Sequence, residues 1–242
     1  MNRFLIPLIL AAGFFFLAEC GIEEYYYLPQ VPEGFVSTTL LTDAVINIPP
    51  ISRYYAIGYT IFYRIYLSDV LAASSSDILR INSSLSGHYN ALDMFTDPAN
   101  SVVTTDTTFS SRGYYELELE NGRKVSEILT TAGGTLRISF PNESWGRPVL
   151  NLNNGADVVL HRSRDLNSPQ PSDNKSFQNT QELGDNANAV SSINADVSGN
   201  SSGTGFAYVS MYILAVGQNP DRFSRIYSKP THINVFRLPD AH

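Results

Sequence analysis

Alternating apolar and polar positions predict β-structure over most of this chain. The clearest case is residues 59–68, where every odd position is apolar or aromatic. Thr60 and Arg64 stand at even positions and mark the opposite, outer face of this strand. Further strand patterns occur at residues 114–120, 135–140, 147–152, 157–161, 206–216 and 233–236, and residues 35–48 fit one strand or a strand pair.

Two aromatic residues of the clearest strand, Phe62 and Tyr66, fall on its outer face. A strand with large apolar groups on both faces is either covered on both sides or exposes part of its apolar surface. Phe62 and Tyr66 therefore form either a second buried layer or an exposed aromatic strip that could serve as a binding surface.

The pattern changes in two later segments. Between residues 78 and 95, apolar side chains recur every three or four positions after a Ser/Asp-rich start, which predicts one amphipathic helix. Residues 163–205 are rich in Asn, Ser, Asp and Gly and poor in apolar residues. Such a segment buries too little apolar surface to offset the entropy of ordering it, so we expect a long flexible loop.

The first 20 residues have the pattern of an export signal. Residues 1–3 form a short basic start, and residues 4–18 form an apolar run that ends at Glu19. This run is shorter than the roughly 20 apolar residues of a membrane-spanning helix. Cys20 follows directly and is the single cysteine of the chain, so internal disulfides are excluded. A plain signal peptide with an incidental cysteine would give the same pattern.

Charge and composition limit the partners of the mature chain. Removal of residues 1–19 takes away Arg3 and Glu19, one charge of each sign, so the net charge stays at −7. Nucleic acid is excluded as a partner because its phosphates would repel such a chain, which has no Lys/Arg cluster. Hydrophobic residues make up 43% of the chain, which is sufficient for a core in one domain of about 200 residues or two small ones.

Candidate chemistry is sparse. Residues 199–203 match the nucleophile-elbow spacing around Ser201, but this pattern needs a preceding strand and a following helix, and neither is predicted. The four histidines, His88, His161, His232 and His242, show no metal-ligand spacing. We therefore predict no catalytic residue, no metal site and no cofactor.

One cluster of side-chain oxygens has two interpretations. Asn151, Asn153, Asn154 and Asp157 resemble a scattered calcium-ligand set, although no Asp-rich loop with a closing Glu is visible. A turn around residues 154–155 explains the same residues more simply.

Three resemblances extend these predictions. Residues 17–21, Leu-Ala-Glu-Cys-Gly, look like a lipobox, in which the thiol of Cys20 receives a diacylglyceryl group and becomes the mature N-terminus. Residues 59–69, residues 208–216 and the 228–231 lead into the last strand resemble the C, F and G strands of a fibronectin type III domain. As a whole, the chain resembles treponemal (spirochaete) lipoproteins of unknown function in its signal and its tyrosine-rich start.

These resemblances imply a mainly β protein with an immunoglobulin-like β-sandwich. Its parts would be a signal peptide (1–19), a lipidated tether (20–34) and one domain (35–242), with a long insertion at 70–204 that contains the helix. The predicted function is a non-catalytic binding or structural lipoprotein, anchored to a membrane of the bacterial cell envelope and facing the periplasm or the surface. Its partner would be a protein, peptidoglycan or a small ligand. The alternative is an unrecognised envelope hydrolase.

Overall fold

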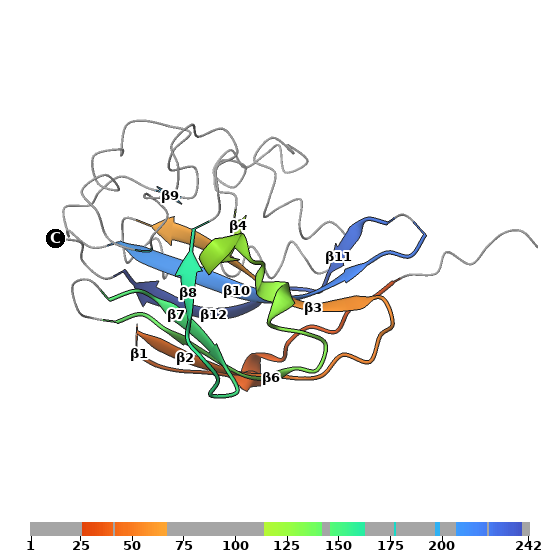
Figure 1. Ribbon diagram of the computed structural model, residues 1–242, viewed down its shortest axis with the longest axis horizontal. Helices are drawn as coiled ribbons and strands as arrows, with labels where there is room; N and C mark the ends of the chain where they lie inside the picture. The colour runs from red at the N-terminus through yellow and green to blue at the C-terminus, as the bar shows by residue number, and fades with distance from the viewer. Residues whose placement is uncertain are drawn as a thin grey trace, which may run out of the picture.

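The computed structural model describes residues 26–40, 42–66, 114–141, 146–162, 177, 197–198, 207–221 and 223–238. These residues form a mainly β structure with two sheets (Figure 1). The first sheet has the order β1 (Val36–Leu40), β2 (Asp43–Ile48), β6 (Gly134–Ser139), β7 (Val149–Leu152), β8 (Val158–His161), β5 (Glu118–Leu119). All of its pairings are antiparallel.

The second sheet is built around two long strands. Its order is β11 (Arg225–Tyr227), β10 (Tyr208–Gln218), β3 (Ala56–Tyr66), β4 (Tyr115–Glu116). β12 (Thr231–Arg237) also pairs with β10, and the two-residue β9 (Val197–Ser198) lies parallel to β3. Three short 3-10 helices complete the described elements: η1 (Glu33–Phe35), η3 (Glu120–Gly122) and η4 (Val125–Glu127).

The pairing of β3 with β10 confirms that these two predicted strands are central neighbours. They are antiparallel, with Ile61 opposite Ile213 and Tyr63 opposite Met211. These four side chains have 0% of their surface exposed. Cross-strand pairs share a face of the sheet, so this set of residues lies on the core-facing side.

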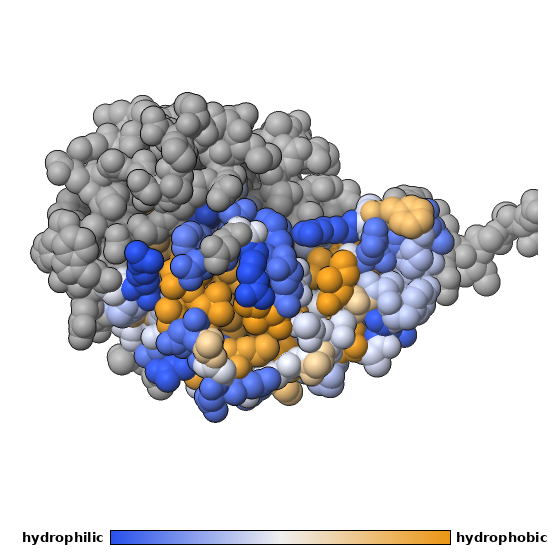
Figure 2. Space-filling model, in the orientation of Figure 1, coloured by the Kyte–Doolittle hydropathy of each residue, from blue (hydrophilic) through white to orange (hydrophobic). Residues whose placement is uncertain are grey.

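Both sheets contribute to one hydrophobic core. Alternating residues of β3 and β10 pack in the same cluster as Ala44, Ile46, Leu136, Ile138 and Leu150 from the first sheet. Figure 1 shows the two sheets as layers, and apolar side chains gather between them in Figure 2. The inward positions of β2 and β6 are two residues apart, as the pleat of a strand requires.

The predicted strand over residues 114–120 is divided between the two sheets. β4 pairs with β3 of the second sheet, whereas β5, two residues later, pairs with β8 of the first. The chain crosses at Leu117, which is fully buried. The chain reverses direction at η3, directly after β5: the Leu119 amide donates to the Arg123 carbonyl at 2.9 Å, and Glu118 forms an antiparallel bridge with Lys124.

The described part of the predicted insertion belongs to the same fold. Residues 114–141 and 146–162 supply β4 to β8 and so contribute strands to both sheets. The amphipathic helix predicted at residues 78–95 lies outside the described residues. So does the loop predicted at residues 163–205, apart from β9 and Phe177. The Phe177 ring is fully buried and contacts Tyr63, with ring centroids 4.9 Å apart.

Candidate functional site

A polar depression lies on the outer face of the first sheet. It is lined by Arg137 and Ser139 of β6, Val149 and Asn151 of β7, and Asn154 and Asp157 of the following connection, and it holds about 340 Å³. Arg137 pairs with Asn151 and Ser139 with Val149 across the two strands. Their neighbours Leu136, Ile138 and Leu150 point into the core, so alternation places the polar side chains outside.

The connection between β7 and β8 is a tight turn that shapes one wall of this depression. Asn153 and Asn154 have φ values of 53° and 57°, and the Gly155 amide donates to the Leu152 carbonyl at 2.9 Å. Two successive positive φ angles are characteristic of a type I′ turn, and asparagine tolerates this conformation. The turn interpretation of these asparagines is therefore confirmed, with its centre one residue earlier than predicted.

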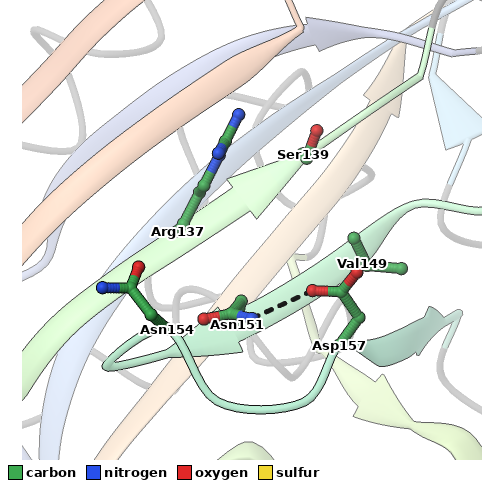
Figure 3. Close-up of a pocket in the computed structure, with 6 residues that line it drawn as sticks. All are labelled: Arg137, Ser139, Val149, Asn151, Asn154 and Asp157. Atoms are coloured by element: carbon green, nitrogen blue, oxygen red, sulfur yellow. Dashed lines mark hydrogen bonds between the residues drawn. The ribbon is translucent and has the colours of Figure 1, made fainter.

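Charges of opposite sign stand on the two sides of the depression. The Arg137 guanidinium forms an ion pair with Asp43 at 3.4 Å and keeps more than half of its side chain exposed. Asn151 donates from its amide nitrogen to the Asp157 carboxylate at 3.0 Å and to the Gly155 carbonyl (Figure 3). These hydrogen bonds hold Asn151 and Asp157 in place, so the depression presents fixed donors and acceptors.

The two residues predicted as a binding surface are buried. Phe62 and Tyr66 are each 1% exposed. The Phe62 ring contacts Tyr227 with centroids 6.0 Å apart, and the Tyr66 and Tyr114 hydroxyls share a hydrogen bond of 3.0 Å. The structure thus has the second buried layer, and neither ring is available at the surface.

The polar residues of that face are buried as well, which corrects the prediction that it is solvent-facing. Thr60 is 0% exposed and Arg64 is 1% exposed. The Thr60 hydroxyl donates to the Glu116 carboxylate at 2.8 Å, and Arg225 and Lys124 also lie within ion-pair distance of Glu116. A buried hydroxyl needs such a partner, because an unsatisfied one would cost free energy.

A serine and a histidine meet on the same outer face. Ser210 of β10 and His232 of β12 form a hydrogen bond of 3.4 Å between Oγ and Nε2. Burial lowers the pKa of His232 from 6.5 to about 4, so the ring is neutral at pH 7. A nucleophile and base of a hydrolase need this proximity, but Ser210 is only 1% exposed and offers a substrate no approach.

The low pKa of His232 predicts a loss of stability in acid. Between pH 6.5 and 4 the unfolded chain binds a proton at this ring while the folded chain does not. The free energy of unfolding therefore decreases as the pH is lowered through this range. In urea melts, the free energy of unfolding of the wild-type protein should decrease between pH 7.5 and pH 4.5. We expect this decrease to be smaller by about 2 to 3 kcal/mol in His232→Gln. His161→Gln is the control and should keep the loss. An equal loss in wild type and His232→Gln would contradict this assignment.

Several residues singled out in the sequence lie outside the described residues: Cys20, Ser201, His88 and His242. His161 is partly buried on β8 of the first sheet, whereas His232 lies on β12 of the second. Within the described ranges, no group of three or more His, Cys, Asp or Glu side chains could hold a metal ion. The same part of the chain contains no helix that is long and apolar enough to cross a membrane.

Sequence reasoning missed Arg137 and Ser139 as members of the depression. Both stand at the outward positions of a predicted strand, and alternation marks them as exposed without indicating that they face Asn151 and Asp157. Only the pairing of β6 with β7 brings the four together.

The described residues form a mainly β structure, with two largely antiparallel sheets around one core and a polar depression on the outer face of the first. No family model matches the chain, and no curated protein and no solved structure is significantly similar to it.

Proposed function

We propose that this protein is an exported lipoprotein, held on a membrane of the bacterial cell envelope by lipid on Cys20. The observation that carries the proposal is the order of basic start, apolar run and single cysteine in residues 1–20. Its likeness to treponemal lipoproteins of unknown function rests on this signal and on the tyrosine-rich start that follows it. The mature chain would begin at Cys20, and residues 20–34 would connect the lipid to the domain.

The domain is best understood as a sandwich of the fibronectin type III or immunoglobulin-like kind with a long insertion. The neighbours β3, β10 and β12 support this, because the resembling C, F and G strands lie side by side in that order in such a domain. The shared core of the two sheets supports it as well.

The domain serves in binding, without catalysis, and the polar depression is its ligand site. The lining groups are an amide, a hydroxyl, a carboxylate and a guanidinium, which suit a polar ligand with several hydrogen-bonding groups. Asp157 and Arg137 are already engaged by Asn151 and Asp43, and this arrangement favours fixed recognition over proton transfer. Of the partners considered, peptidoglycan and small polar ligands match this lining better than an apolar protein surface does.

Replacement of the anchoring cysteine tests the proposal. Cells that express the wild-type chain should incorporate a labelled fatty acid into it and retain it in the membrane fraction. Cys20→Ala should lose the label, because no thiol remains to accept the diacylglyceryl group. Ser201→Ala is a control that leaves the apolar run and the cysteine unchanged and should keep both properties. Incorporation of the label into Cys20→Ala would refute the anchor.

The same preparations test the binding role. Wild-type protein in detergent should sediment with purified peptidoglycan in a saturable manner, and Ser139→Trp, which fills the depression, should weaken this. Lys229→Ala replaces an exposed residue of the second sheet's β11–β12 connection and should have no effect. Equal sedimentation of wild type and Ser139→Trp would remove the depression from the binding account.

A further inference from the structure

Aromatic side chains, some exposed and some partly buried, gather at the end of the domain where the described chain begins. We call this set the aromatic end: Tyr26, Tyr27, Tyr54, Tyr55 and Phe223. Tyr54 is 79% exposed, Phe223 77% and Tyr27 64%. Residues 26–32 and the β10–β11 hairpin meet at this end in Figure 1, and Figure 2 shows apolar surface at the hairpin.

Three chain segments are joined there by ring contacts and hydrogen bonds. The Tyr55 ring meets the rings of Tyr26 and Tyr54 edge to face, each with centroids 5.2 Å apart. The Tyr55 hydroxyl donates to the Tyr27 carbonyl at 2.6 Å, and the Gln218 amide donates to the Tyr55 carbonyl at 2.9 Å. These contacts hold the tyrosine rings of the aromatic end in fixed positions relative to one another.

The hairpin between β10 and β11 adds Phe223 to this surface. Desolvation first, and then hydrogen bonds with Asp221 and Tyr54, raise the pKa of Tyr26, so the turn containing Asp221 is connected to the tyrosines. Phe223 has a φ of 53°, a conformation that aromatic residues rarely adopt. The turn keeps the Phe223 ring exposed to solvent despite the conformational free energy that this φ costs.

The position of the anchor identifies what covers the aromatic end. Cys20 precedes Tyr26 by six residues, which span at most about 20 Å when fully extended. If Cys20 carries lipid, the aromatic end is the part of the described domain whose chain leads most directly to the bilayer. Tyrosine is enriched at membrane interfaces, because its ring is apolar and its hydroxyl is polar.

We propose that the aromatic end rests on the lipid surface to which the chain is anchored, with the Tyr54 and Phe223 rings in the headgroup layer. This inference depends on the proposed lipid anchor and adds a fixed orientation to it. The net charge of −7 would repel an anionic bilayer, so the contact is made by aromatic rings. With the aromatic end on the membrane, the polar depression on the outer face of the first sheet has a fixed orientation relative to the bilayer.

Quenching of tryptophan by brominated lipid tests this orientation. Phe223→Trp and Tyr54→Trp are expressed as full chains, purified from membranes and reconstituted in vesicles of phosphatidylcholine and phosphatidylglycerol with acyl chains brominated near the headgroup. The emission of the native Trp145, the single tryptophan, is subtracted by means of the unsubstituted protein. Phe35→Trp is the matched control, because Phe35 is 42% exposed and lies in η1, away from the hairpin in Figure 1.

We expect the tryptophans at positions 54 and 223 to lose emission in brominated vesicles, in high salt as in low salt, and the tryptophan at position 35 to keep it. Protein that is bound to the vesicles but shows no quenching at either position would overturn the docked orientation and leave the lipid anchor standing. Protein that is absent from the membranes of the expressing cells would overturn both.

Discussion

Replacing Ile61 with alanine should lower the free energy of unfolding by about 2 to 5 kcal/mol. Ile61 is fully buried at the centre of β3, opposite the equally buried Ile213, and faces the first sheet across the shared core. Removal of three of its side-chain carbons deletes apolar contacts and leaves a cavity that two paired strands cannot readily close. Urea unfolding of both proteins measures the difference.

Ile57→Ala is the matched control for this change. It removes the same atoms from the same strand, but Ile57 is 44% exposed, so we expect a cost below about 1 kcal/mol. Thr60→Ala is a poor control, because it would remove a buried hydrogen bond to Glu116. If Ile61→Ala were as mild as Ile57→Ala, the face of β3 that carries Ile61 would not be the core-facing one.

Replacing Gly58 with alanine should cost about 3 kcal/mol or more. A Cβ at this position would lie 2.2 Å from the Leu129 carbonyl oxygen and 3.1 Å from the Thr130 Cα. Both are backbone atoms held by the hydrogen bond from the Tyr59 amide to the Leu129 carbonyl at 2.8 Å, so neither can move without breaking that contact. The close approach of residues 129–130 to β3 requires a residue without a side chain.

Gly34→Ala provides the comparison for Gly58. No atom lies within 4 Å of the added carbon at Gly34, so its stability should stay within about 0.5 kcal/mol of wild type. Thermal melts of both variants measure the effect. Equal melting temperatures for Gly58→Ala and wild type would mean that residues 129–130 do not pack against β3 as described.

The strands whose patterns were strongest in the sequence could be predicted well. Sequence patterns located β3, β6, β7, β8, β10 and β12 within a few residues, and alternation identified Ile61 as an inward-facing position. Each of these strands packs at least one face against a large core, and that face requires an apolar side chain at every second residue. β11 was missed because its three residues, at a sheet edge, are too few to show a period.

The outer face of the second sheet shows why alternation can fail. Thr60 and Arg64 are polar and were expected at the surface, yet both are buried. A polar residue can be buried when neighbouring strands supply partners, as β4 supplies Glu116 to Thr60, and such partners cannot be recognised before the pairing is known.

The candidate site could be predicted only in part. Asn151, Asn153, Asn154 and Asp157 were grouped because they are close in sequence and typical of a turn. Arg137 and Ser139 come from a strand more than ten residues away and join them through strand pairing alone. The aromatic end likewise could not be predicted, since the residues that meet there, such as Tyr27 and Tyr55, are far apart along the chain.

The mass of the N-terminal peptide of the mature protein tests the central claim most directly. Protein purified from membranes of expressing cells is digested, and the peptide that contains Cys20 is analysed by mass spectrometry. The lipid-anchor account predicts a chain that begins at Cys20, with a diacylglyceryl group on the thiol and a fatty acid on the amino group. A peptide with an unmodified Cys20, or one that still carries residues 4–18, would contradict it.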